Sequence, residues 1–218
     1  MSGTFITFEG IDGSGKSTQL RLLSNYLRER GCSLLLTREP GGTTIGLRLR
    51  AALLDAQEEV DPLTELLVFA ADRAQHVRRV LRPALEKGIV VISDRYADAT
   101  VAYQGAGRGF EPGLIAEIVR LATEGLKPDL TLLFDVPVAE STNRTTRRVN
   151  ARRDRLDIEQ PDFHERVRRA YLEIAASEPD RIKVIETSGP VEATQERLKM
   201  IVIPFLESRG HLRRRSNK

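Results

Sequence analysis

A glycine-rich stretch near the start of the chain carries residue types that bind phosphate. It runs from Gly10 to Thr18, follows the pattern G-x-x-x-x-G-K-[ST], and is called the phosphate loop below. Glycines let backbone N–H groups close around phosphate oxygens, and the N-terminus of a following helix adds partial positive charge. In such loops the lysine, here Lys16, reaches the β- and γ-phosphates, and the hydroxyl of Ser17 faces Mg²⁺. The predicted nucleotide site comprises Gly10, Ile11, Asp12, Gly13, Ser14, Gly15, Lys16, Ser17 and Thr18.

The segments on either side of the phosphate loop favour a nucleotide site over a glycine turn without a ligand. Residues 4–8 are apolar and rich in β-forming types, which predicts a strand, and residues 17–27 carry apolar side chains at helical spacing. Strand, glycine loop and helix, in that order, form the context in which this pattern binds phosphate.

Five short apolar runs alternate with longer helical patterns. The runs are 4–8, 33–37, 89–93, 130–135 and 182–186. Their alternation predicts an α/β fold, with a five-stranded parallel sheet that has helices on both faces, in a single domain of residues 1–210. Because ligands bind beyond the carboxyl ends of the strands in such sheets, residues that follow each run are expected to lie close together.

Polar residues follow the second and third runs. Residues 37–43 form a turn rich in proline and glycine, and Asp94 and Arg95 come directly after the third run. A carboxylate at Asp94 suits Mg²⁺, directly or through water, and Arg95 suits phosphate. Residues 100–109 place polar side chains ahead of a flexible glycine stretch; this is either a structural loop or, given its position, part of the site.

Two helical patterns carry arginines whose role the spacing leaves open. Arg48 and Arg50 fit a solvated helix face as well as they fit phosphate binding. Phe69 and Arg73 are four residues apart and therefore share one helix face, where they would stack on and hydrogen-bond a flat ring. On spacing alone, a core phenylalanine with a surface arginine is the simpler interpretation.

Composition limits the class of protein. The chain has 218 residues, of which 40% are hydrophobic and 30% charged, and it shows neither a signal peptide nor an apolar run near the roughly 18 residues of a membrane span. The single cysteine, Cys32, cannot form an internal disulfide. We therefore expect a soluble, cytoplasmic protein without membrane association.

Arginines are clustered although the net charge is only +3. Six lie within residues 144–155 and three within residues 213–215. Such clusters are typical of nucleic-acid binding or of a site that handles several phosphate charges. Residues 144–157 have little apolar surface, which favours a mobile lid over transferring phosphate, with a solvated helix as the alternative. Residues 211–218 form a basic tail that we expect to be disordered.

Over residues 4–207 the chain resembles the bacterial thymidylate kinases, a family of nucleoside monophosphate kinases. The matching motifs are FEGIDGSGKST at 8–18, TREPGGT at 37–43, FAADR at 69–73, DRY at 94–96 and AYQGAGRG at 102–109. The resemblance implies a P-loop kinase fold with a small arginine-rich lid. It also implies transfer of the ATP γ-phosphate to dTMP, giving dTDP and ADP for dTTP synthesis, with Mg²⁺ and a homodimer.

The resemblance further implies which residues act. The catalytic set is Asp12, Lys16, Arg95 and Arg153; Arg148 joins the phosphate loop in binding ATP; Ser17 and Asp94 hold the metal. The dTMP site is formed by Glu39, Arg50, Phe69, Arg73, Arg95, Thr100, Tyr103 and Gln104.

Within that set, the resemblance implies distinct contacts. Phe69 stacks on thymine while Arg73 hydrogen-bonds the base. Thr100 and Gln104 lie along the base edge, and Tyr103 lies against the deoxyribose where a 2′-hydroxyl would clash. The acceptor phosphate is held by Arg50 and Arg95, and Asp12 sits between donor and acceptor.

Four positions distinguish this chain within the family. Gly13 stands where one branch has an arginine, so the chain resembles the branch whose arginines come from the lid. Leu47 replaces a usual glutamate and Ala99 a usual serine. Asp157 ends the lid with a carboxylate one methylene shorter than usual.

The chemistry explains the arginines without nucleic acid, and we expect no nucleic-acid partner. The acceptor is a phosphate monoester with a second pKa of about 6, so its attacking oxygen is largely ionised at neutral pH. The obstacle is repulsion between two polyanions, since one pair of unit charges 4 Å apart costs about 4 kcal/mol at an effective dielectric of 20. Lys16, the arginines and Mg²⁺ offset that repulsion.

Two other functions remain compatible with the phosphate loop. One is a kinase for another nucleotide or deoxynucleoside. The other is a nucleotide-gated binding protein or nucleic-acid ATPase, which only the basic tail supports. A GTPase is disfavoured because the guanine motif N-K-x-D is absent from the sequence.

Overall fold

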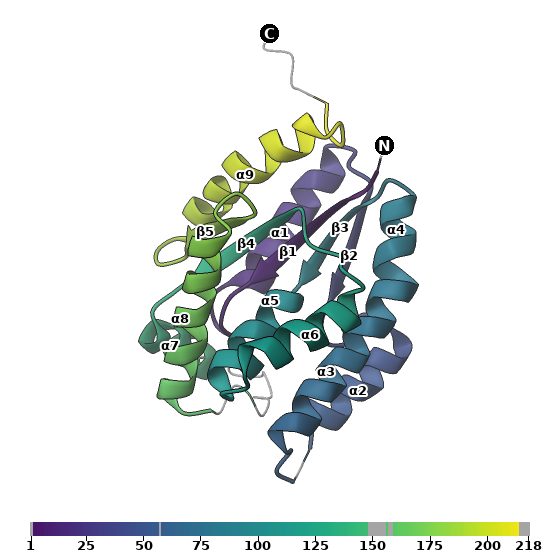
Figure 1. Cartoon of the computed structure of the whole chain (residues 1–218). Coiled ribbons are helices and arrows are strands. Elements are labelled where there is room, and N and C mark those ends of the chain that lie inside the picture. Colours follow the sequence, from purple (N-terminus) through teal and green to yellow (C-terminus); the bar gives the residue numbers. More distant parts are fainter. Residues whose placement is uncertain (1, 57, 148–155, 157–158, 214–218) are drawn as a thin grey trace.

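A five-stranded parallel sheet forms the centre of the molecule (Figure 1). The computed structural model describes residues 2–56, 58–147, 156 and 159–213. The strands are β1 (Thr4–Glu9), β2 (Leu34–Arg38), β3 (Val90–Asp94), β4 (Leu130–Asp135) and β5 (Ile182–Glu186), in the order β2-β3-β1-β4-β5. The predicted α/β fold with a five-stranded parallel sheet is confirmed.

Strand β1 is the central strand, and its position explains its composition. It pairs with β3, where Thr4 faces Val90, and with β4, where Ile6 faces Leu130. Every residue of β1 is buried, including the polar Thr4, Thr7 and Glu9, as expected for the central strand of a parallel sheet covered on both sides. Because all strands run in the same direction, the phosphate loop after β1 and Asp94 at the end of β3 lie at one edge of the sheet.

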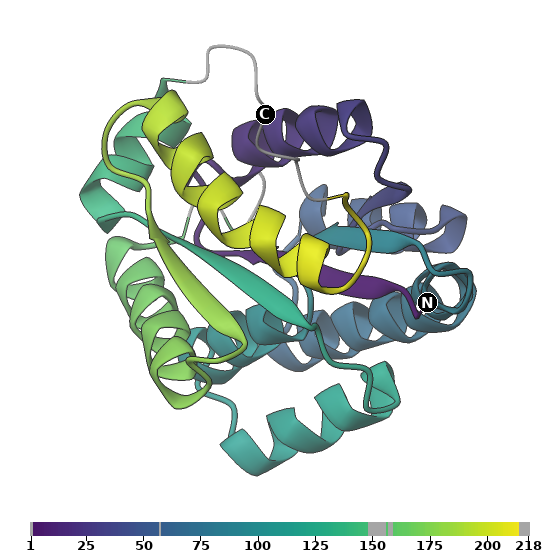
Figure 2. The ribbon, with the colours of Figure 1, turned by 90° about the horizontal axis from the view of Figure 1, so that it is seen from above.

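Helices cover both faces of the sheet (Figure 2). The longer ones are α1 (Lys16–Glu29), α2 (Thr44–Leu54), α3 (Pro62–His76), α6 (Pro112–Thr123), α7 (Val138–Thr146), α8 (Pro161–Ser177) and α9 (Val191–Ser208). Short ones are α4 (Arg82–Glu86) and α5 (Ala97–Thr100), with π-helical segments η1 (Val77–Leu81) and η2 (Val101–Gly107). None of the helices in the described part of the chain is long and apolar enough to cross a membrane.

Each face of the sheet has its own apolar core. On one face, α1 and α9 contribute Leu23 and Leu198 to a cluster with Ile6 and Phe8 of β1. On the other face, a cluster between α8 and η2 includes Tyr103 and Val167. A third cluster joins Phe5 of β1 and Val91 of β3 to Leu81. Burial of this kind contributes about 25 cal/mol per Å² of apolar surface, so the three clusters fix the covering helices onto the sheet.

The segment predicted as a flexible glycine stretch is instead helical. Residues 101–107 form η2, which continues α5 and packs on α8. A Cβ atom on Gly107 would lie 2.7 Å from the ring of Phe163, so this glycine lets the two helices approach. Helix α6 follows, between the third and fourth apolar runs, where a helical pattern was expected without stated bounds.

Residues 211–213, at the start of the segment predicted to be a disordered tail, contact the folded chain. Leu212 is buried in the cluster between α1 and α9, and His211 Nε2 lies 2.8 Å from Thr4 Oγ1. Arg30 also donates to the backbone carbonyl of Arg213. These contacts hold residues 211–213 on the folded chain, and the prediction for residues 214–218 lies outside the described residues.

Candidate active site

The phosphate loop has the backbone shape that its glycines predict. It joins β1 to α1, and Gly10, Gly13 and Gly15 have φ values of 130°, 77° and 93°, which side chains other than glycine rarely adopt. Lys16, the first residue of α1, folds back and donates from Nζ to the carbonyl oxygens of Gly10 (2.8 Å) and Ile11 (2.9 Å). The Lys16 ammonium group therefore lies inside the loop that is predicted to bind phosphate.

The structure explains why this chain has no arginine at position 13. A Cβ atom on Gly13 would lie 2.6 Å from the carbonyl oxygen of Ser141 in α7. The Ser141 hydroxyl also donates to the carbonyl oxygen of Asp12, which ties α7 to the loop. A larger residue at position 13 would require α7 to move.

Burial and neighbouring charge both act on Lys16. Burial of the side chain and then the charge of Arg95 lower the pKa of its ammonium group, while Asp12 opposes the shift; together they bring this pKa to about 8. Phosphate charges placed in the loop would favour the protonated lysine and reverse this effect.

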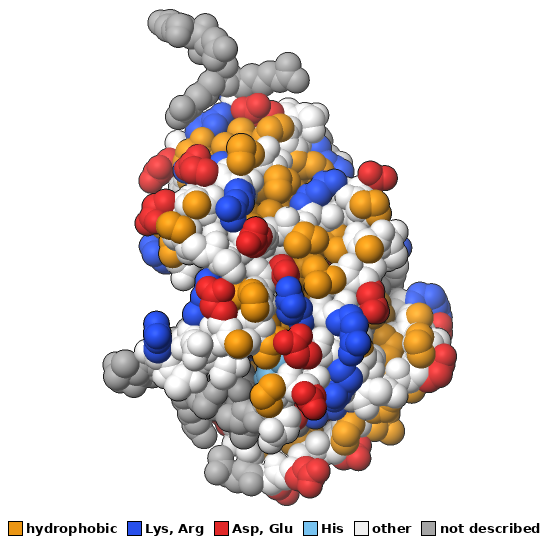
Figure 3. Space-filling view, turned by 90° about the vertical axis from the view of Figure 1, so that its left-hand side faces the viewer, with side chains coloured by type: hydrophobic (Ala, Val, Ile, Leu, Met, Phe, Trp, Pro, Cys, Tyr) orange, Lys and Arg blue, Asp and Glu red, His pale blue; other side chains and the backbone are white. Residues whose placement is uncertain are grey.

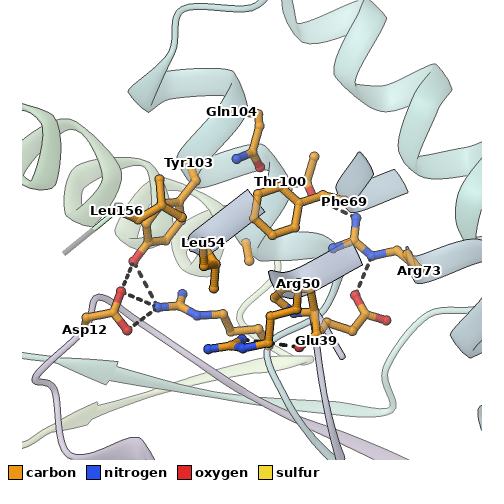
Figure 4. A pocket seen from close by; sticks show the side chains of 13 residues that line it. Asp12, Glu39, Arg50, Leu54, Phe69, Arg73, Thr100, Tyr103, Gln104 and Leu156 are labelled. Atoms are coloured by element: carbon orange, nitrogen blue, oxygen red, sulfur yellow. Dashed lines mark hydrogen bonds and ion pairs between the residues drawn. The ribbon is translucent and has the colours of Figure 1, made fainter. Parts of the chain in front are cut away.

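Asp12 and Arg95 form an ion pair at the boundary between the phosphate loop and the neighbouring pocket (Figure 4). Arg95 Nη2 donates to both carboxylate oxygens of Asp12 at 2.8 Å, and the Tyr103 hydroxyl donates to Asp12 Oδ2 at 3.2 Å. Burial opposes ionisation of Asp12, but Arg95 and Lys16 outweigh it and hold the pKa of the carboxyl well below its usual range. Asp12 therefore stays a carboxylate at neutral pH.

Arg95 is held in a backbone conformation that is unusual for its residue type. Its φ is 71°, in the left-handed region, and its N–H donates to the carbonyl of Phe8 in β1. Its guanidinium contacts the hydroxyl of Tyr171 at 3.3 Å, and that hydroxyl donates to the buried Glu9. Strain of about 1 kcal/mol or more at such a residue is typical of functional positions.

A pocket beside the phosphate loop gathers most of the predicted site residues (Figure 4). It encloses about 560 Å³ of empty space, including the part open to solvent. The predicted residues that line it are Asp12, Glu39, Arg50, Phe69, Arg73, Arg95, Thr100, Tyr103 and Gln104; Pro40, Leu54, Ala99 and Leu156 complete the lining. Segments that follow three different strands thus meet at one cavity.

Arg73 is not a surface residue, and the simpler interpretation of its spacing is wrong. It is 3% exposed and donates to Glu39 Oε2 (2.8 Å), Thr100 Oγ1 (2.7 Å) and the Tyr96 carbonyl (2.9 Å). Phe69, one turn earlier in α3, is half-buried and lines the pocket. The pair therefore offers an aromatic face and a fixed guanidinium on the same wall.

Gln104 is also held in place by a buried partner. Its Nε2 donates to Oε1 of Glu65, a fully buried residue of α3, at 2.8 Å. Arg108 pairs with the same carboxylate at 3.0 Å and with Glu159 at 2.7 Å. An amide fixed in this way presents its remaining groups in one orientation to whatever fills the pocket.

Two of the predicted arginine positions differ in exposure. Arg50 is half-buried, lines the pocket and donates to the carbonyl of Pro40 at 3.3 Å. Arg48 is exposed and matches the solvated alternative. The lid residues Arg148, Arg153 and Asp157 lie outside the described residues.

Some residues at the site had no signal in the sequence. Leu54 and Leu156 line the pocket, but single leucines in such patterns are otherwise indistinguishable from core. Arg144 in α7 lies over the phosphate loop, where it donates to the carbonyl of Gly13 at 3.5 Å and to that of Thr187 at 2.8 Å. The sequence indicated Arg144 only as one of the six arginines within residues 144–155.

The predicted metal ligands fit a magnesium ion bound mainly by phosphate. Asp94 Oδ1 is buried without a hydrogen-bond partner among the described residues, and Ser17 is exposed at the start of α1. Within the described part of the chain, no group of three or more His, Cys, Asp or Glu side chains is arranged to hold a metal ion. Mg²⁺ commonly takes one or two protein oxygens and completes its shell with phosphate and water.

Comparison with known proteins gives one consistent family. The family model described as thymidylate kinase matches residues 8–198. A thymidylate kinase of Geotalea uraniireducens is 47% identical over 209 residues, covering 94% of this chain and 98% of its own length. One of Desulfovibrio desulfuricans is 48% identical over 213 residues, with 94% and 98% covered. The crystal structure of thymidylate kinase from Ehrlichia chaffeensis is 36% identical, has a TM-score of 0.75, and aligns over 95% of this chain and 100% of its own.

Proposed function

The chain belongs to the thymidylate kinase family, and we propose that it transfers the γ-phosphoryl group of ATP to dTMP between its phosphate loop and the adjacent pocket. The observation that carries this proposal is the Asp12–Arg95 pair, which borders both places. The phosphate loop suits a triphosphate, and the pocket suits a ring that carries a phosphate. A phosphoryl group would therefore pass at the boundary between the loop and the pocket.

In the acceptor pocket, we assign the base to the wall formed by Phe69 and Arg73. Phe69 would stack on thymine, Arg73 would donate to a base carbonyl, and Thr100 and Gln104 would lie along the base edge. The buried Tyr103, whose hydroxyl contacts Asp12, would border the deoxyribose and leave no room for a 2′-hydroxyl.

At the other end of the pocket, Arg50 and Arg95 would bind the acceptor phosphate. A phosphate there would compete with Asp12 for Arg95, and the carboxylate would keep the guanidinium aimed at the boundary. Because the phosphate monoester is largely ionised at neutral pH, no proton needs to be removed from the acceptor. The chain's contribution is to bring two polyanions together in line.

On the donor side, the phosphate loop and Lys16 would bind ATP. The lysine would exchange its contacts with the carbonyls of Gly10 and Ile11 for phosphate oxygens. Ser17 and Asp94 would hold Mg²⁺, which supplies charge neutralisation when it is bound. Arg148 and Arg153 stay predictions of the resemblance, as does the lid of residues 144–157.

Partners and location follow from the same family. We assign a homodimer, a cytoplasmic location and no nucleic-acid partner. On the face drawn in Figure 3, basic and acidic side chains are interspersed among hydrophobic ones over much of the surface, rather than gathered in the basic stripe expected of a nucleic-acid binder.

A panel of acceptors tests the proposed function. ADP release with ATP and Mg²⁺ would be measured by a coupled assay with dTMP, dUMP, dCMP, dGMP, AMP and UMP. We expect dTMP to have the highest kcat/KM and dUMP the next, since one methyl group in an apolar pocket is worth about 1–3 kcal/mol. Use of AMP or dCMP as good as that of dTMP would contradict the thymidylate assignment, and DNA-stimulated ATPase activity without acceptor dependence would favour a nucleic-acid ATPase.

A further inference from the structure

A buried histidine stands behind the wall that we assign to the base. We propose that His76 is a positioning residue for recognition of the acceptor: it holds Glu39 in the orientation in which Glu39 aims Arg73 into the pocket. His76 is the last residue of α3 and does not line the pocket itself. Its effect must therefore pass through Glu39, which does.

The contacts of His76 fix both the ring and the carboxylate. His76 is fully buried, its Nδ1 lies 2.8 Å from Glu39 Oε1, and its Nε2 lies 2.6 Å from Thr37 Oγ1. A carboxylate only accepts hydrogen bonds, so Nδ1 is the donor to Glu39, while Nε2 and the Thr37 hydroxyl share the second hydrogen bond. A Cβ atom on Gly42 would lie 2.5 Å from Nε2, so the turn closes tightly over the ring.

The two carboxylate oxygens of Glu39 accept hydrogen bonds from different residues. Oε1 accepts from His76, while Oε2 accepts from Arg73 Nε at 2.8 Å. Arg73 has five N–H donors, of which the described contacts use one each at Nε, Nη1 and Nη2. One hydrogen on each Nη atom is left for a ligand. The direction of these two hydrogens depends on the plane of the guanidinium, and the hydrogen bond to Glu39 fixes that plane.

Loss of the donor at His76 would change the pocket in two ways. Oε1 of Glu39, in a side chain that is 3% exposed, would lose its charge-assisted hydrogen bond and the carboxylate would be free to turn. Turning would release Arg73 Nε from its present orientation. It would also bring negative charge toward the space beside Arg50, where the acceptor phosphate is assigned.

The effect should be confined to the acceptor. The described side-chain hydrogen bonds of His76 are with Thr37 and Glu39, on the acceptor side, whereas the donor site is built from the phosphate loop. A change at His76 should therefore alter the KM for dTMP and leave the KM for ATP and kcat nearly unchanged. This inference rests on the proposed function, because it presumes that dTMP occupies the pocket.

Three substitutions separate the two contacts of the ring. Asparagine carries an amide nitrogen near the position of Nδ1, glutamine carries one near Nε2, and leucine carries neither. We expect His76→Leu and His76→Gln to raise the KM for dTMP about tenfold or more, the loss of one charge-assisted hydrogen bond, and His76→Asn to raise it less than about threefold. Thr37→Val, which leaves the Glu39 contact in place, should behave like His76→Asn.

A second histidine provides a matched control. His211 also pairs with a threonine, Thr4, but does so at the opposite end of β1 from the phosphate loop. His211→Leu should lower the melting temperature without changing the KM for dTMP. The steady-state assay should be run well below the melting temperature of each variant, with kcat as the measure of the folded, active fraction.

Two outcomes would overturn the inference and are distinct from failure of the proposed function. Equal KM values in His76→Leu and wild type would do so, as would equal losses in His76→Asn and His76→Gln, since either result removes the role of the Nδ1 donor. If wild-type enzyme itself failed to phosphorylate dTMP, the assignment of the pocket would fall first.

Discussion

Lys16 is the residue on which phosphoryl transfer depends most directly. Its ammonium group is buried among loop carbonyls, and no uncharged side chain at this position would offset the repulsion between donor and acceptor phosphates. We expect Lys16→Ala to retain less than about a tenth of wild-type turnover, a loss of more than about 1.4 kcal/mol in transition-state stabilisation. The measurement is kcat with saturating dTMP.

The fold should survive this change, and a surface lysine provides the comparison. Lys87 is exposed, so Lys87→Ala should match wild type in both turnover and melting temperature. Turnover of Lys16→Ala near the wild-type value would contradict the role assigned to the phosphate loop.

Glu9 is a buried carboxyl group whose protonation should affect stability. It is fully buried in β1, accepting from the Tyr96 N–H at 2.7 Å and from the Tyr171 hydroxyl at 2.8 Å. Burial, and then the charge of Asp98, raise its pKa from an ordinary 4.5 to about 7, although Arg95 opposes this. The folded chain thus keeps a proton that the unfolded chain has released, so this group lowers the free energy of unfolding as pH rises from 4.5 to about 7.

Glu9→Gln should remove that part of the pH dependence. Glutamine can still accept from the Tyr96 N–H and donate to the Tyr171 oxygen. The free energy of unfolding of the variant, minus that of wild type, should therefore rise by about 1–3 kcal/mol between pH 5 and pH 8. Urea denaturation at both pH values measures it, with the exposed Glu86→Gln as control; a difference that stays constant with pH would show that Glu9 titrates normally.

At the scale of elements, packing between η2 and α8 should position the pocket residues of η2. Gly107 would meet Phe163 if it had a Cβ atom, whereas a Cβ on Gly105, two residues earlier, would meet Ile115 at an ordinary 3.7 Å. Gly107→Ala should therefore destabilise the fold by about 1–3 kcal/mol through overpacking. It should also raise the KM for dTMP, because Tyr103 and Gln104 belong to the same segment.

Gly105→Ala is the matched comparison for this element. It makes the same chemical change in the same segment and should leave the free energy of unfolding within about 1 kcal/mol of wild type. The test compares the thermal stability and the KM for dTMP of Gly107→Ala with those of Gly105→Ala. If the two variants had the same stability, close approach of η2 to α8 would not be what the glycine provides.

Elements with local signals could be predicted, and those that depend on distant partners could not. The strands and the phosphate loop follow from apolar runs and a glycine pattern in adjacent residues. Gly107 instead acts through Phe163, which is far away in the sequence, and therefore looked like part of a flexible loop. His76 likewise gains its role only when α3 brings it to Glu39. The resemblance supplied the pocket residues that spacing alone left open, Arg73 above all.

At the scale of the whole molecule, the end of the chain is joined to its beginning. Leu212 is 5% exposed in the core between α1 and α9, while His211 contacts Thr4 of β1. Leu212→Ala should lower the free energy of unfolding by about 2–4 kcal/mol, the usual cost for a buried leucine. Met200→Ala, which alters a residue of α9 that is 69% exposed, should change it by less than about 0.5 kcal/mol. Equal stability of the two variants in urea would mean that the C-terminal segment does not anchor the fold.

Assembly is the remaining property at this scale, and one surface is suited to it. Helices α2, α3 and α6 pack side by side, and each exposes large apolar side chains: Ile45, Leu47, Leu63, Leu67, Leu114 and Leu121. Leu47, which replaces a glutamate that the resemblance gives as usual in the family, adds to this apolar surface. Exposed apolar side chains on neighbouring helices are what a protein interface would cover, which supports the homodimer assigned from the family.

Leu67→Glu should dissociate the proposed dimer. Leu67 is 51% exposed on α3, the helix that packs against both α2 and α6, and an unpaired charge buried at an interface costs several kcal/mol. In sedimentation equilibrium, wild type should have twice the chain mass of 24.4 kDa, and Leu67→Glu should approach the chain mass. Met200→Glu makes the same change on α9 and should stay dimeric. A monomeric wild type would contradict the homodimer, and dissociation of Met200→Glu alone would move the interface from α3 to α9.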